Sequence, residues 1–253
     1  MTVREPQQRY AATFDWPSWR PDRVRLLSVV VLAAFTMALL LRHRSGDVPL
    51  ACLVIVEAAL LLLPWRLPRI DRSDASFCAE IAVGLITPIG ATVTTLLTRP
   101  SWLSRAGNPL WYLAALALLA GLITAQGTDL RAVIGGDLSF LAGPTPAWFR
   151  RGRSTAIAVG PIGEEFAFRG PVLTGADPVL AVLGAAAFIA RHHVQPGRNG
   201  RGTARTWAVE VLGAAGFLLL TWLSGSLYPA IIAHLLYNLP GLVVELRRDT
   251  VTR

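Results

Sequence analysis

Eight stretches of this sequence are long and almost entirely apolar, and short arginine-bearing segments separate them. A helix that crosses a membrane needs roughly 20 mostly apolar residues. The chain is 53% hydrophobic and 16% charged, whereas a soluble domain carries about 25% charged residues. We therefore predict an all-α, polytopic integral membrane protein with eight transmembrane helices, over residues 24–41, 48–65, 76–98, 109–126, 154–173, 177–193, 205–224 and 226–246.

The segment between the fourth and fifth predicted spans, residues 127–153, is unsuited to crossing a membrane. It contains Gly135-Gly136, two prolines and a cluster of arginines that follows Trp148. We interpret it as a partly amphipathic connector at the membrane interface. The chain then divides into an N-terminal four-span membrane region (1–126), the interfacial connector (127–153), a C-terminal membrane core (154–246) and a cytoplasmic tail (247–253).

The basic residues of the chain are all arginine, and the formal net charge is +8. They form no basic patch with interleaved aromatic residues, so we expect the lipid bilayer and no nucleic acid as a partner. If both termini are cytoplasmic, the arginines of the opposite side are only Arg42, Arg44, Arg99 and Arg105, which satisfies the positive-inside bias. We therefore expect an integral protein of a bacterial plasma membrane. The arginines expected on the cytoplasmic side are the five at the start of the chain and those of residues 66–72, 131–153, 191–205 and 247–253.

Five other side chains within or beside the apolar stretches need an interpretation. Cys52 and Cys78 have no CxxC pair or Cys/His cluster nearby, so we interpret them as buried thiols rather than a disulfide or a cysteine zinc site. Glu57 lies near mid-span and has no charged partner four residues away. We expect it to reach a polar group on another helix or to stay protonated. Glu80 and Glu210 lie nearer to span ends, where snorkelling is easier.

Two neighbouring acids in the fifth span differ in their surroundings. Residues four apart share a face of a helix, so Glu165 and Arg169 are expected to form an ion pair. Glu164 points to a different face and is free to act elsewhere. A desolvated carboxylate near another acid has a raised proton affinity, which suits a general base or acid.

The sixth and eighth spans repeat this spacing with other polar groups. His192 follows Phe188 by four residues, and Asn238 follows His234 by four. If the three helices meet, Glu164 and His192 could remove a proton from water, while His234 and Asn238 could stabilise the oxyanion of an attacked carbonyl. Each pair taken singly can be explained by a structural role, either as an ion pair that stabilises one helix or as polar side chains that hold two helices together. Their joint occurrence on three helices favours a site.

The ordered set EExxxR, FxxxH and HxxxN resembles the CPBP family of CAAX prenyl endopeptidases and bacteriocin-processing enzymes, also called the Abi family. The resemblance covers about residues 155–240. It implies an integral membrane endopeptidase with its site in a water-filled intramembrane cavity. By matching position it implies Glu164, His192, His234 and Asn238 as catalytic residues, with Glu165, Arg169 and Phe188 in support.

The resemblance leaves two mechanisms and two functions open. Two histidines and one glutamate could bind zinc, with water as the fourth ligand, which would make Glu164, His192 and His234 the zinc ligands. A metal-free glutamate mechanism is equally consistent with the family, and we favour it, with no obligatory cofactor. The expected substrate is a peptide bond of a membrane-associated protein or peptide. The alternative is a non-catalytic membrane binding or immunity protein that uses the same cavity, in an oligomeric state that the sequence leaves open.

Overall fold

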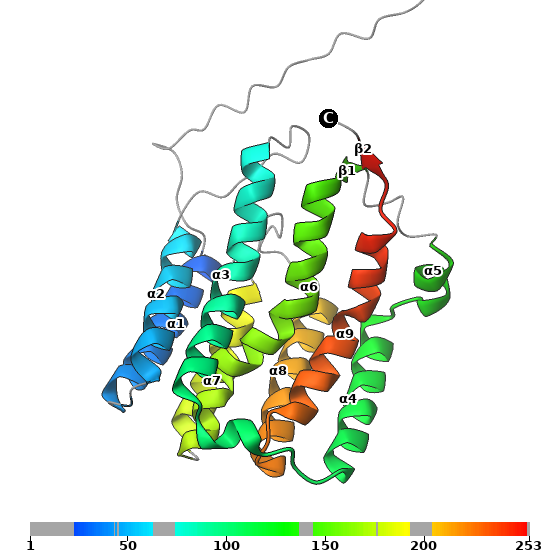
Figure 1. Cartoon of the computed structure of the whole chain (residues 1–253). Helices are drawn as coiled ribbons and strands as arrows, with labels where there is room; N and C mark the ends of the chain where they lie inside the picture. The colour runs from blue at the N-terminus through cyan, green and yellow to red at the C-terminus, as the bar shows by residue number, and fades with distance from the viewer. Residues whose placement is uncertain are drawn as a thin grey trace, which may run out of the picture.

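The computed structural model describes residues 23–42, 44, 46–62, 74–136, 144–175, 177–192 and 204–251. Within these residues the chain is almost entirely helical, and the long helices form one bundle (Figure 1). The α-helices are α1 (Arg23–Leu41), α2 (Asp47–Leu62), α3 (Asp74–Thr98), α4 (Leu110–Gln126), α5 (Leu130–Gly135), α6 (Ala147–Phe168), α7 (Pro178–His192), α8 (Ala204–Ser224) and α9 (Tyr228–Leu246). Two 3₁₀ helices, η1 (Ser101–Ser104) and η3 (Gly170–Thr174), and two short strands, β1 (Thr145–Pro146) and β2 (Thr250–Val251), complete the described chain.

Each of the eight predicted spans overlaps one α-helix, so the prediction of an all-α membrane protein is confirmed. Helices α1, α8 and α9 have both the length and the hydropathy of a membrane-crossing helix. Helices α4 and α7 are apolar but shorter. Large apolar side chains are exposed on many helices, for example Leu97 at 78% and Val182 at 65%, as expected for surfaces that face lipid. The number of eight crossings stays a prediction.

Helix α6 begins earlier and ends earlier than the predicted fifth span, 154–173. It starts at Ala147, inside the predicted connector, because arginine is a good helix former and extends the helix through the basic segment. It ends at Phe168 because Pro171 has no N–H to donate to the carbonyl oxygen of Ala167, and the chain continues as η3. Residues 137–143 of the predicted connector lie outside the described residues.

The C-terminal segment packs against the beginning of α6. Strands β1 and β2 are parallel neighbours, with Thr145 opposite Thr250. Arg153 Nε lies 3.1 Å from Glu245 Oε2, and Arg150 donates a hydrogen bond of 3.0 Å to the carbonyl oxygen of Arg248. Much of the segment predicted to be a tail therefore fastens α9 to α6.

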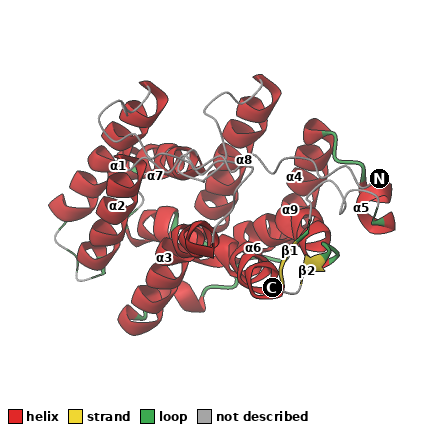
Figure 2. Cartoon of the chain, turned by 90° about the horizontal axis from the view of Figure 1, so that it is seen from above, coloured by secondary structure: helices red, strands yellow, loops and turns green. Residues whose placement is uncertain are grey.

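Helix α6 lies between α3 and α9, and α7 and α8 lie behind this row (Figures 1 and 2). Two glycines allow the backbones to approach closely. A Cβ on Gly163 would overlap the backbone of Pro88 in α3, and one on Gly184 would overlap the carbonyl oxygen of Phe168. Small residues permit such contacts between membrane helices, and both contacts lie next to the acids of α6.

Arg42 and Arg44, which the charge bias placed on the disfavoured side, have structural contacts there. Arg42 donates a hydrogen bond of 2.8 Å to the carbonyl oxygen of Pro171 and lies 3.4 Å from Asp47. Both arginines also contact Thr174. The two arginines donate hydrogen bonds to carbonyl oxygens of η3. This structural role explains why arginines occur at this position.

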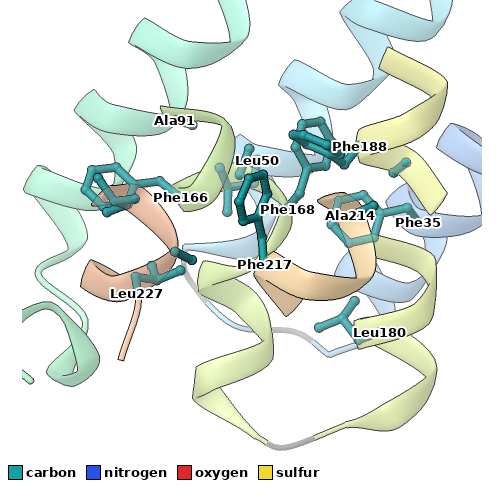
Figure 3. Close-up of a cluster of buried hydrophobic side chains, with 14 of the residues drawn as sticks. Phe35, Leu50, Ala91, Phe166, Phe168, Leu180, Phe188, Ala214, Phe217 and Leu227 are labelled. Carbon is teal, nitrogen blue, oxygen red and sulfur yellow. The ribbon is translucent and has the colours of Figure 1, made fainter. Parts of the chain in front are cut away.

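Aromatic residues from several helices form the core beside the acids of α6 (Figure 3). The rings of Phe168 and Phe188 lie 6.2 Å apart, and those of Phe188 and Phe217 lie 6.5 Å apart, both nearly perpendicular. Cys52 and Cys78 are exposed, so the prediction that they are buried is wrong. A thiol is weakly polar and needs no cover on a surface that faces lipid.

Candidate active site

Glu165 connects α6 to α9 through a buried cluster of charges. Arg169 Nη1 donates a hydrogen bond of 2.7 Å to Glu165 Oε1, and both side chains are fully buried. The predicted ion pair is therefore present. His234 Nδ1 lies 2.8 Å from the same oxygen, so Glu165 also fixes the orientation of the imidazole. The sequence did not predict this second role.

Aromatic rings complete the environment of Arg169. Its guanidinium carbon lies 4.2 Å from the ring centre of Phe188 and 5.4 Å from that of Phe217. Arg169 Nε and Nη2 are buried and have no hydrogen-bond partner within the described part of the chain. The faces of the two rings stabilise the cation where acceptors are missing. Phe188 therefore contacts Arg169 directly, and its supporting role in the site stays a prediction.

Glu164 and the two histidines converge on one point. Glu164 Oε2 lies 4.0 Å from His192 Nε2 and 3.8 Å from His234 Nε2. Glu164 and His234 are almost entirely buried. The three residues come from α6, α7 and α9, so the structure brings the motifs of the three helices together.

The hydrogen bonds of the imidazoles assign their tautomers. His192 Nδ1 lies 2.8 Å from the carbonyl oxygen of Phe188, which can only accept a hydrogen bond. His234 Nδ1 faces the carboxylate of Glu165, another acceptor. In the neutral rings, therefore, each Nδ1 carries the proton and each Nε2 is an acceptor. Both Nε2 atoms face Glu164 Oε2, which is also an acceptor when ionised.

Asn238 is the one predicted catalytic residue that the structure does not bring into contact with the others. Its side chain is half-buried, one turn beyond His234 on α9. Among the described residues it makes no hydrogen bond with Glu164, His192 or His234.

Arg191 is a site residue that the sequence analysis missed. The charge pattern of the sequence predicts a cytoplasmic arginine here, but Arg191 is only 4% exposed and lies in α7. Its Nε donates a hydrogen bond of 3.0 Å to Glu164 Oε1, and its Nη1 forms an ion pair with Glu57 Oε1. The prediction that Glu164 is free is therefore wrong, because its Oε1 is ion-paired with Arg191. Of the two alternatives for Glu57, contact with a polar group on another helix is the one present.

A signal for this contact exists in the sequence. Arg191 occupies a variable position of the FxxxH motif, within an apolar helix, and Glu57 is an unpaired acid in another span. Two opposite charges embedded in different apolar helices are costly unless they pair. That cost predicts an ion pair between Arg191 and Glu57, but it does not predict the additional contact of Arg191 with Glu164.

The donor atoms suit a bound water better than zinc. Tetrahedral zinc with bonds of 2.0–2.1 Å holds its ligand atoms about 3.3 Å apart, whereas Glu164 Oε2 lies 3.8 and 4.0 Å from the imidazole nitrogens. In the described part of the chain no group of three His, Cys, Asp or Glu residues has the geometry of a metal site. The guanidinium of Arg191 also occupies the other oxygen of Glu164. We therefore assign no catalytic step to a metal.

Comparison with known proteins finds a family that this region resembles. Residues 146–240 match the family model described as type II CAAX prenyl endopeptidase Rce1-like. The match begins at β1 and ends within α9, so it includes the three motifs and every residue predicted for the site. No curated protein and no solved structure matches the chain significantly. Residues 146–240 are thus similar to the Rce1-like type II CAAX prenyl endopeptidases, in agreement with the resemblance of the three motifs to the CPBP family.

Proposed function

We propose that the chain is an intramembrane endopeptidase that hydrolyses a peptide bond of a membrane-associated protein or peptide. The observation that carries the proposal is the convergence of three acceptor atoms, Glu164 Oε2 and the Nε2 atoms of His192 and His234, at 4.0 and 3.8 Å. A water molecule at this point donates its two protons to Glu164 Oε2 and His192 Nε2, and its oxygen lone pair remains available for attack.

Glu164 is the general base of the proposed reaction, and His192 helps to hold the water. As the water oxygen forms a bond to the peptide carbonyl carbon, one water proton passes to Glu164 Oε2 and the carbonyl electrons move onto oxygen. Glu164 then returns this proton to the peptide nitrogen as the C–N bond breaks. Proton transfer by a positioned carboxylate contributes about 10²–10⁴-fold to such a rate.

His234 and Asn238 stabilise the oxyanion in this proposal. His234 Nδ1 donates to Glu165. When the neutral imidazole takes up a proton during the reaction, this carboxylate balances its charge and Nε2 becomes a donor. The same arrangement of carboxylate and histidine operates in serine proteases. Asn238, one turn further along α9, supplies the second donor once substrate is bound, since catalytic hydrogen bonds tighten in the substrate complex.

We place the entrance of the site at the end of α7. The side chain of His192, the last residue of α7, is 21% exposed, against 8% for Glu164 and 3% for His234. In the topology with both termini cytoplasmic, this end of α7 faces the cytoplasm. A substrate would then reach Glu164 from the cytoplasmic side.

Comparison of membrane-protein termini tests the proposed function. A strain without the protein is complemented with wild type, with Glu164→Gln, or with Glu245→Gln, a control that removes a carboxylate distant from the site. We expect new termini with wild type and with the control, and none with Glu164→Gln. If wild type yields the same termini as the strain without the protein, the chain is a non-catalytic binding or immunity protein.

A further inference from the structure

Arg191 joins groups from three helices at one buried guanidinium. From its place in α7 it contacts Glu164 of α6 and Glu57 of α2. Its Nη2 donates a hydrogen bond of 3.3 Å to the carbonyl oxygen of Gly84 in α3. A planar guanidinium with five donors in a fixed fork is suited to holding several acceptors at once.

The acceptor on α3 is available because of a proline. In a regular helix the carbonyl of Gly84 would accept a hydrogen bond from the N–H of residue 88. Residue 88 is proline, which has no N–H, so this carbonyl loses its partner within the helix. Arg191 supplies the missing donor.

The contacts of Arg191 determine which oxygen of Glu164 faces the histidines. Arg191 Nε holds Oε1 at 3.0 Å, and Oε2 is the oxygen that lies toward His192 and His234. The carboxylate cannot rotate without losing this charge-assisted hydrogen bond in a buried environment. The orientation of the general base therefore depends on a residue of another helix.

Glu57 in turn holds Arg191. Glu57 is 1% exposed, and its Oε2 has no hydrogen-bond partner within the described part of the chain, so the ion pair of its Oε1 with Arg191 is the contact that balances its charge. Without Glu57, the guanidinium can turn toward Glu164 and engage both carboxylate oxygens. Oε2 would then be drawn away from the imidazoles.

We propose that Arg191 is a positioning residue for the general base Glu164, and that Glu57 and the Gly84 carbonyl hold Arg191 in the orientation that this requires. The inference rests on the proposed function of the site. It assigns a role in the reaction to the N-terminal half of the chain, through α2 and α3, which the family match at residues 146–240 does not reach.

The inference is tested by measuring kcat and KM for four variants of the full-length protein. The substrate is one identified by the comparison of membrane-protein termini. We expect Arg191→Gln to lower kcat about 100-fold, because a small misplacement of a catalytic group has an effect of this size, while KM changes less than twofold. We expect Glu57→Gln to lower kcat about tenfold. The double variant should be no slower than Arg191→Gln alone, since Glu57 acts through Arg191. Arg191→Lys should recover little, because an ammonium cannot span the three acceptors.

A matched control separates positioning from stability. Glu245→Gln also removes a buried carboxylate from an ion pair, with Arg153 at 3.1 Å, and should keep kcat within twofold even where its unfolding midpoint falls as far as that of Glu57→Gln. If Arg191→Gln does not fold, Glu57→Gln against this control decides the question. Equal kcat values for the two would overturn the inference.

The failures of the two proposals are distinguishable. If wild type cleaves nothing, the proposed function itself is wrong, and if Glu164→Gln cleaves at the wild-type rate, Glu164 is not the general base. If Glu164→Gln is inactive while Arg191→Gln keeps the wild-type kcat, or if the effects of Glu57→Gln and Arg191→Gln multiply in the double variant, the proposed function stands and the positioning role of Arg191 is overturned.

Discussion

Replacement of Glu165 by glutamine should separate the two roles of this residue, one in stability and one in catalysis. Glu165 Oε1 accepts hydrogen bonds from Arg169 at 2.7 Å and from His234 at 2.8 Å, in a region without exposed surface. Removal of one partner from a buried ion pair costs about 3–5 kcal/mol. We expect this loss in the free energy of unfolding of Glu165→Gln, because the guanidinium of Arg169 is left without a carboxylate at hydrogen-bonding distance.

A second substitution should restore stability without restoring activity. In Glu165→Gln with Arg169→Met, the unbalanced charge is gone and the thioether can pack on Phe188 and Phe217. Replacement of both partners of a buried pair is often neutral or stabilising, so we expect most of the lost 3–5 kcal/mol to return. The kcat should remain about 10⁴-fold below wild type, as when the carboxylate that orients a catalytic histidine is lost.

Two measurements check this prediction. Unfolding in mixed micelles with increasing SDS gives the free energy of unfolding, and cleavage of a natural substrate gives kcat. Recovery of kcat in the double variant would refute the role of Glu165 in orienting His234. A double variant as unstable as the single one would refute the assignment of the energetic cost to the stranded Arg169.

Three further predictions concern packing, metal dependence and topology. Gly163→Ala should lower the free energy of unfolding by about 1–3 kcal/mol, because the added Cβ meets the backbone of Pro88. Gly121→Ala places its Cβ in open space and should raise the free energy of unfolding by about 0.5–1 kcal/mol. Equal midpoints of the two variants in thermal unfolding would contradict this. Exhaustive chelation should leave kcat unchanged, and an activity that disappears on chelation and returns with zinc would show that the metal-free mechanism is wrong. In a background without the two natural cysteines, Thr252→Cys should react with an impermeant maleimide from the cytoplasmic side and Arg105→Cys from the opposite side; reaction of both from one side would contradict the topology.

The helices could be predicted from sequence because a membrane restricts the choices of the backbone. In lipid every backbone polar group must be satisfied within the chain, so a long apolar stretch becomes a helix. The two boundaries of α6 were harder to predict. Its start lies in a basic segment that resembles a connector, and its end depends on Pro171, four residues before the Gly175 that follows η3.

The site could be predicted in part, because helical spacing is a local property. The pair Glu165–Arg169 follows from two residues four apart on one helix. The contact of Glu165 with His234 and those of Arg191 with Glu57 and Glu164 join different helices. Such contacts depend on how the helices pack, which spacing along one helix does not report.

The central claim is that Glu164 activates the water that cleaves the peptide bond. Single-turnover cleavage of a natural substrate in ¹⁸O-labelled water, by wild type and by Glu164→Gln, tests it most directly. The account predicts one ¹⁸O atom in the new terminal carboxylate with wild type, and a rate at least about 10³-fold lower with Glu164→Gln. A Glu164→Gln protein that cleaves at the wild-type rate, with the same incorporation of label, would contradict it.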